Sequence, residues 1–443
     1  MKIKQTRTKF TLPLFTALVV AQTGISRAAP PVSESRLQTY EERVESVTET
    51  PGLVAFWDFV QREEGVNGTG KFVAHTAKGD EHRYVLEPHN ISVDYWHQGE
   101  EASLADFPLL NRGPFGQAVQ FRDPKSETDL PVLMVPRSLL HDTPLDIKGP
   151  GKSVTMLVWL IYQGEDHGIA GMWLEGTDTP GVKDPAPVQV KGARQFGLFA
   201  GLGANPGGVS AHISENGLST FGDRYARHMS TTSEKMKKIS VDAKGADLDK
   251  GWSTIGFTFD SQTKAVRSFL DGSSSEVWVE NPEKDRHYKY AAEAWQKGKL
   301  AASKQPVADS EANEFYSPPE TTPLSEKIVS ETAGERVVER TYEYTKVRVT
   351  LRKDSQGQVS ETVSSALVAL KSNPYWFGHD IYAPRTLAEG GPFTVGRVIH
   401  SNRHKTLSAY IGGVAVFDRA LTSEEMACLS AIGRDQPIIT PSK

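Results

Sequence analysis

The sequence predicts an all-β fold: a two-sheet antiparallel jelly-roll sandwich with a long insertion of mixed helix, loop and hairpin. Many short segments are rich in β-branched and aromatic residues, or alternate apolar and polar residues with the period of two that half-buried strands require. Turn pairs such as Asn216-Gly217 and Asp271-Gly272 separate them. With 38% hydrophobic and 24% charged residues, the composition is that of a globular protein. Many short strands between turns indicate a sandwich or jelly roll.

Ten segments are predicted to be strands. In 153–162, Val154, Met156, Val158 and Leu160 alternate with other residues and should share one face of a sheet. In chain order the ten segments are 53–60, 116–121, 153–162, 168–174, 195–200, 208–213, 252–259, 265–270, 393–399 and 408–417. We expect the last strands to return and pair with a sheet that the first strands open, because an edge would otherwise stay unpaired.

Two stretches interrupt this strand pattern. Residues 223–250 are polar and rich in lysine and are predicted to be a mobile excursion. Residues 281–392 are predicted to be an insertion into the sandwich. Within the insertion we expect a helix over 288–304, a loose or disordered loop over 307–335, and a hairpin formed by 336–353 and 358–371.

The first residues resemble a targeting segment. A basic stretch is followed by an apolar run over 10–21 and by Ser26-Arg27-Ala28, a small-x-small cleavage pattern. The apolar run is too short to span a membrane, which takes about 20 residues, and no later segment is long enough to form a membrane span. We expect 1–28 to be a cleaved signal peptide, 29–52 to be a linker or short helix, and the protein to be secreted or periplasmic.

The charge pattern excludes some partners. The chain has a net charge of −5, and residues 1–28 hold five basic and no acidic residues, so the remainder carries −10. An acidic body disfavours binding to nucleic acid or to anionic membrane surfaces. The single cysteine, Cys428, excludes an intramolecular disulfide and any metal site built from several cysteines.

Two features bear on metal binding. Asp247-Leu-Asp249-Lys-Gly251 is one residue short of a calcium loop and lacks the downstream bidentate glutamate. It is a candidate donor of oxygens to calcium, and the alternative is a solvated acidic turn. His400 and His404 lie four residues apart outside any predicted helix, where this spacing does not bring two ligands to one face. Calcium therefore stays a possible cofactor, and the sequence indicates no other.

Four blocks, taken in order, resemble the laminin-G-like jelly roll of the concanavalin A-like lectin/glucanase superfamily. The blocks are the opening strand 53–59, the "GxFGxAxxF" block at 113–122 with 154–159, the "WHHVAxTYD" and "YVDG" blocks at 251–260 and 269–272, and the closing block at 393–397 and 409–425. The closing block resembles a last strand followed by a helix start that Ser423 can cap. Gly412-Gly413 departs from the family's Asp-Glu pair. The resemblance implies one laminin-G-like jelly roll over 53–427, with the insertion 281–392, and a C-terminal tail over 428–443.

The resemblance implies a secreted, non-catalytic, lectin-like recognition module that binds carbohydrate or a cell-surface partner. Tyr375, Trp376, His379 and Asp380 are the predicted binding residues, because aromatic rings stack on sugar C–H faces and His and Asp bind hydroxyls. Arg397 and Asn402 would complete a polar rim. The alternative is that the aromatic residues of this segment pin the insertion to the sandwich.

The same superfamily includes glucanases and polysaccharide lyases, so an enzyme is the second hypothesis. Glucanases of this fold carry acids spaced Glu-x-Asp-x-x-Glu on one strand. Here Glu127-Thr-Asp129 is followed by Val132, and Glu283-Lys-Asp285 by Tyr288, so the third acid is missing in both places. We therefore expect no catalysis. A structural protein of the cell envelope is a third hypothesis, supported only by export and acidity.

Overall fold

The computed structural model describes residues 38–122, 126, 128–165, 167–175, 192–201, 205–217, 229–302, 316–399 and 407–434. The predicted signal peptide lies outside these residues, as do Asn402, His400 and His404. Each of the ten predicted strand segments overlaps an observed strand, and the all-β prediction is confirmed. No helix in the described part of the chain has the length and apolar character of a membrane span.

The first large sheet contains both the first and the last strand of the chain's described part, β1 and β23. Strand β1 pairs antiparallel with β23, so the last strand does return to the first. The strands in sheet order are β21 (Tyr375–Trp376), β15 (Ala265–Leu270), β14 (Trp252–Asp260), β9 (Val154–Gly164), β23 (Ser408–Phe417), β7 (Ala118–Phe121) and β6 (Leu109–Leu110), with β1 (Leu53–Trp57) beside β23.

The second large sheet has ten strands. In sheet order they are β13 (Ser230–Lys235), β12 (Gly208–Ile213), β11 (Ala193–Ala200), β10 (Gly168–Leu174), β22 (Phe393–Val395), β8 (Pro131–Val135), β5 (Val85–Asn90), β4 (Phe72–Val73), β2 (Gln61–Arg62) and β3 (Gly65–Val66). The prediction for 223–250 is wrong in part, because this segment contains β13 and the short helix α4 (Ala246–Asp249). Strand β13 is polar, and pairing with β12 fixes its conformation.

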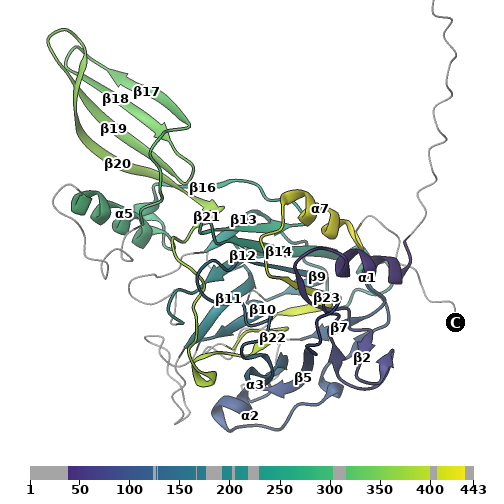
Figure 1. The fold of residues 1–443 in the computed structure, drawn as a ribbon. Helices are drawn as coiled ribbons and strands as arrows, with labels where there is room; N and C mark the ends of the chain where they lie inside the picture. Colours follow the sequence, from purple (N-terminus) through teal and green to yellow (C-terminus); the bar gives the residue numbers. More distant parts are fainter. Residues whose placement is uncertain are drawn as a thin grey trace, which may run out of the picture. The chain divides into compact units, whose positions relative to one another are not determined.

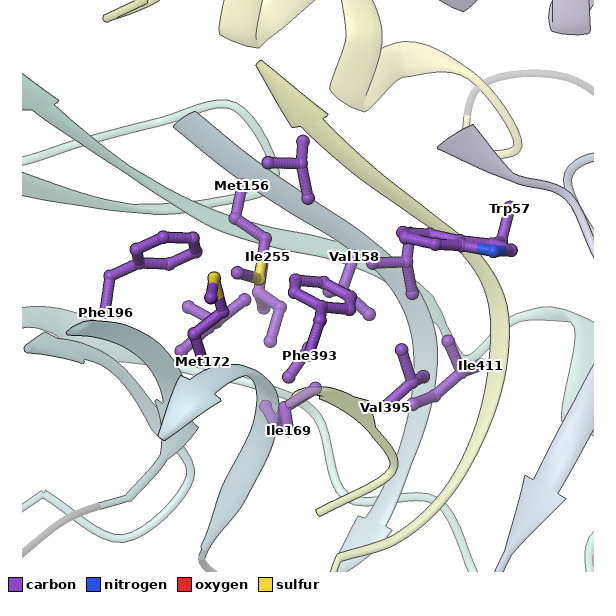
Figure 2. Packing of buried hydrophobic residues seen from close by; sticks show 14 of the residues in the cluster. Trp57, Met156, Val158, Ile169, Met172, Phe196, Ile255, Phe393, Val395 and Ile411 are labelled. Carbon is purple, nitrogen blue, oxygen red and sulfur yellow. The ribbon is translucent and has the colours of Figure 1, made fainter. Parts of the chain in front are cut away.

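The main core lies between the two large sheets. Met156 and Val158 of β9 meet Met172 of β10 and Phe393 of β22 in one buried cluster (Figure 2). Val154, Met156, Val158 and Leu160 all belong to this cluster, as their alternation predicts. Side chains from the two inner faces therefore interdigitate as in other β-sandwiches.

Two terminal helices cover the outside of the first sheet. Helix α1 (Tyr40–Thr48) and helix α7 (Ser423–Ala431) contribute Val47, Met426 and Leu429 to a cluster with Trp159. This cover explains why β9 is buried along its whole length instead of on one face only. The N-cap of α7 is Thr422, not the predicted Ser423, and its hydroxyl accepts from Glu425 N. The other short helices are α2 (Ile91–Trp96), α3 (Arg137–Leu140), η1 (Leu104–Asp106), η2 (Pro282–Lys284) and η3 (Leu387–Glu389).

A third antiparallel sheet, labelled β16 to β20 in Figure 1, combines four strands of the predicted insertion with β16, which lies just before residue 281. Its strands are β16 (Val277–Glu280), β20 (Val359–Asn373), β19 (Thr345–Lys353), β18 (Glu335–Thr341) and β17 (Ser325–Glu331), in that order. The predicted helix is confirmed as α5 (Lys289–Ala302), and the predicted hairpin is confirmed for β19 and β20, but its first arm 336–353 contains two paired strands, β18 and β19. The prediction of a loose loop over 307–335 is wrong at 325–331, which form strand β17. Strand β21 lies within 281–392 yet pairs with β15 of the sandwich.

Candidate functional site

The aromatic segment that the sequence singles out lies at the edge of the first sheet. Tyr375 is fully buried and packs against Tyr288 and Tyr316, with ring centroids 5.9 and 5.6 Å away. Trp376 is partly buried and meets the Tyr316 ring edge-on at 5.6 Å. Gly378 lies close against the Trp376 ring, because a Cβ at this position would lie 2.5 Å from that ring. A buried Tyr375 cannot present its ring to a ligand, so this residue anchors the insertion.

His379 and Asp380 are engaged by protein groups. His379 Nδ1 donates to the carbonyl oxygen of Asp380 at 2.9 Å, and burial lowers the pKa of His379 to about 4. Oδ1 of Asp380 forms an ion pair with Lys264 and accepts from Gly151 N at 3.3 Å. Arg397 is buried and follows β22 of the second sheet, whereas the aromatic segment borders the first. These contacts hold His379 and Asp380 in place, and a role of the predicted residues in binding stays a prediction.

The candidate calcium turn also has protein partners. Asp249 lies at the end of α4 and forms an ion pair with Arg112 at 2.8 Å, and Asp247 lies 3.4 Å from Lys250. Cationic side chains thus face both carboxylates. The turn therefore gives no further support for a calcium ion.

One group of three candidate metal ligands occurs among the described residues: His141, Asp142 and Asp146, whose ligand atoms lie within 4.8 Å of one another. Arg137 donates to both oxygens of Asp146 at 2.6 and 2.9 Å, and Lys148 Nζ contacts Asp142 and Asp146 at 2.6 and 2.7 Å. Burial raises the pKa of Asp146, but the hydrogen bonds from Arg137 and Lys148 bring it below its usual value. Two cations already neutralise the cluster, so we assign it as an ion-pair network.

The insertion contains a cleft whose floor is one face of the third sheet. Val338 and Val349 lie opposite each other in the β18–β19 register, and Arg340 lies opposite Val347. We call this face the inner face. Its valines are buried, and Ser365 of β20 lies beside Val349 on the same face. The period of two therefore places Arg340 next to an apolar floor.

Helix α5 forms one wall of the cleft. Tyr288, Ala291 and Trp295 recur at the spacing of one helix face and are all buried in a cluster with Val347 and Val349. The hydroxyl of Tyr288 donates to Met229 O at 2.9 Å, which ties the residue preceding the helix to the start of β13. Trp295 is thus held above the inner face.

Residues 316–320, which we call the strap, form the opposite wall. Tyr316 is buried, and Ser317 and Pro318 line the cleft. The carboxylate of Glu320 accepts from Thr345 N at 3.0 Å, from Thr345 Oγ1 at 2.5 Å and from Tyr344 N. These three bonds fasten the strap to the turn between β18 and β19.

The cleft has a volume of about 200 Å³. Its lining combines aromatic rings, hydroxyls, a guanidinium and an apolar floor, and consists of Trp295, Ser317, Pro318, Glu320, Arg340, Tyr342, Thr345, Val347, Val349, Thr362 and Ser365. Arg340 Nε donates to Glu326 at 2.7 Å, and this bond raises the pKa of the guanidinium. The Nη atoms of Arg340 carry four more N–H donors. Converging polar groups around an apolar floor are typical of small-molecule sites.

The sequence predictions missed this cleft, although one signal for it was visible. Val338, Arg340 and Tyr342 alternate along one predicted strand, so a cation and a phenol share a face with an apolar residue. Nothing in the sequence indicates that Trp295 and the strap would cover that face. The cleft forms only when a helix, a loop and three strands come together.

Comparisons with known proteins leave the family open. No family model matches the chain, and no curated protein matches it. Among solved structures it is similar to Trypanosoma rangeli sialidase in complex with sialic acid, at 10% identity and TM-score 0.34, with 90% of this chain and 38% of that chain covered. The botulinum neurotoxin serotype D binding domain gives 7% identity, a TM-score of 0.33 and coverage of 88% and 52%.

A third structure is domain 4 of AbnA, a GH43 extracellular arabinanase from Geobacillus stearothermophilus, in complex with arabinotriose. It gives 10% identity, a TM-score of 0.34 and coverage of 85% of this chain and 98% of that domain. The chain spans well under half the length of the sialidase. Likenesses at this level leave the function of this chain open, since one fold hosts many functions.

Proposed function

We propose that this chain is an exported, non-catalytic, lectin-like protein that binds carbohydrate in the cleft of the insertion. The observation that carries the proposal is the lining of the cleft, where the partly exposed ring of Tyr342 accompanies the Arg340 guanidinium and several hydroxyls, and buried Trp295 adds apolar lining. Aromatic rings can pack on the C–H face of a sugar, while hydroxyl and N–H groups bind its hydroxyls. The resemblance of the strand blocks to laminin-G-like domains and the predicted signal peptide also support this proposal.

The carboxylates near the cleft favour binding over hydrolysis. Most glycoside hydrolases use two carboxylates free to exchange a proton or to attack, about 5–9.5 Å apart. Here three donors occupy the oxygens of Glu320, and Glu326 is held by Arg340. Both acids therefore hold protein elements in place, and we propose that the cleft binds its ligand without cleaving it.

A glycan-array screen of the exported protein, followed by calorimetric titration of the best glycan, tests the proposal. Arg340→Gln removes the guanidinium from the inner face and should weaken binding about tenfold or more, since hydrogen bonds that involve a charged group contribute about 1.5–3 kcal/mol. Arg348→Gln is the matched control, because Arg348 lies on the opposite face of the same sheet, paired with Glu339 at 3.3 Å. Equal affinities of the two variants, or no glycan bound at all, would contradict the proposal.

A further inference from the structure

We infer that the cleft takes one terminal, uncharged sugar residue of a glycan, and this inference rests on the proposed function. The first argument is size. At about 200 Å³ the cleft is smaller than the roughly 300–1,000 Å³ of pockets for drug-sized ligands. A single sugar ring matches this volume, whereas a run of linked sugars does not.

The second argument is that the cleft is closed toward the sandwich. Tyr316 of the strap packs against Tyr375 and Trp376 at the edge of the sandwich, with ring centroids 5.6 Å away in both cases. The Glu320 hydrogen bonds to Thr345 join the strap to the sheet at that end. An internal sugar of a polymer needs two exits for its neighbours. In the described part of the chain the strap closes the end of the cleft that faces the sandwich, so a chain end fits there and an internal sugar does not.

The third argument is charge. Glu320 and Arg340 are the charged residues of the lining, and Arg340 is already paired with Glu326. The three groups together carry a net charge of −1. An acidic sugar would bring its carboxylate near Glu320 while competing with Glu326 for Arg340. Hydroxyl groups of a neutral sugar avoid this repulsion and can accept from the remaining Arg340 donors.

Titration of the full exported protein with one neutral sugar at increasing chain length tests the size and closure arguments. The monosaccharide and its oligomers should bind within about threefold of one another per chain end, because only the terminal residue is buried. Affinity that rises about tenfold or more with length, or that survives chemical blocking of the terminal residue, would overturn the inference. If such binding still depends on Arg340, the proposed function stands and this inference alone fails. If no binding depends on Arg340, the proposed function itself fails.

A substitution tests the charge argument. Glu326→Gln releases Arg340 and should strengthen binding of the matching uronic acid about fivefold or more while changing the neutral sugar little. Glu326 is 40% exposed, so the fold should tolerate the change. Glu339→Gln makes the same chemical change on the opposite face, beside Arg348, and should have no effect. Tighter binding of the uronic acid than of the neutral sugar by the unaltered protein would overturn the inference.

Discussion

Asn373, at the end of β20, joins the insertion to the sandwich through buried hydrogen bonds, and its removal should be costly. Its Oδ1 accepts from Ser268 N and Ser230 Oγ, both at 2.9 Å. Its Nδ2 donates to Ser268 O and Ser274 Oγ, both at 3.1 Å, and to Ser275 O at 3.0 Å. The side chain is fully buried, so one amide satisfies backbone groups of β15 and of the loop that follows it.

Asn373→Ala would leave the N–H and C=O of Ser268 without these partners. A buried polar group left unsatisfied costs about 1–3 kcal/mol, so the two groups together should lower the free energy of unfolding by about 2–5 kcal/mol. That is a large part of the roughly 5–15 kcal/mol that stabilises a typical protein. The hydrogen bond from Asn373 to Ser275 O should contribute less to stability, because Ser275 is partly exposed and water can replace the amide there.

Urea unfolding at neutral pH measures this loss by linear extrapolation. Gln356→Ala is the control, because it removes an amide from an exposed position in the turn between β19 and β20. It should change stability by less than about 0.5 kcal/mol. If Asn373→Ala costs less than about 1 kcal/mol, water replaces the amide and Asn373 is not the joint between the two parts.

Three further predictions concern residues near the two large sheets. Because burial lowers the pKa of His379 to about 4, the unfolded chain binds one more proton than the folded chain between about pH 6.5 and 4. The free energy of unfolding should therefore fall by up to about 3 kcal/mol as the pH is lowered through this window. His379→Gln should flatten this pH dependence, measured by urea unfolding at each pH. Trp376→Ala should lower the melting temperature with a loss of about 1–3 kcal/mol, because the ring packs against Tyr316 and Gly378, and should leave glycan affinity unchanged. Arg137→Ala should cost about 1.5–3 kcal/mol, because it removes two hydrogen bonds from the buried carboxylate of Asp146 and leaves Lys148 as its cationic partner.

Each of these three has an outcome that contradicts it. A pH profile of the His379→Gln variant that overlays the original profile would remove His379 as the cause. Loss of glycan binding by Trp376→Ala at unchanged stability would move the site to the aromatic segment. Full recovery of the Arg137→Ala variant by millimolar calcium or zinc would show that the Asp146 cluster is a metal site.

The sandwich could be predicted from the sequence because its signals are local. Strand β9 alternates so regularly that Val154, Met156, Val158 and Leu160 could be assigned to the core face, and glycine-rich turns delimit most of the other strands. Strand β17 could not be predicted this way. Its seven residues are all exposed and mostly polar, and only pairing with β18, which follows it in the chain, makes them a strand.

The candidate site could not be predicted because exposure cannot be inferred from residue type. The run Tyr375 to Phe377 has the composition of a sugar-binding platform. Its Tyr375 is nevertheless buried by Tyr288 and Tyr316, which lie 59 or more residues earlier in the chain. The cleft residues are spread from Trp295 to Ser365, with no short motif among them. Their common feature is one face of one sheet, which requires the register of β18, β19 and β20.

A crystal structure of the protein with its best array glycan tests the central claim most directly. We predict one terminal sugar ring against Tyr342, within about 4 Å of Val347 or Val349, with a hydroxyl accepting from Arg340. Density for the sugar at Trp376 to Asp380, or anywhere else outside the cleft, would contradict the account.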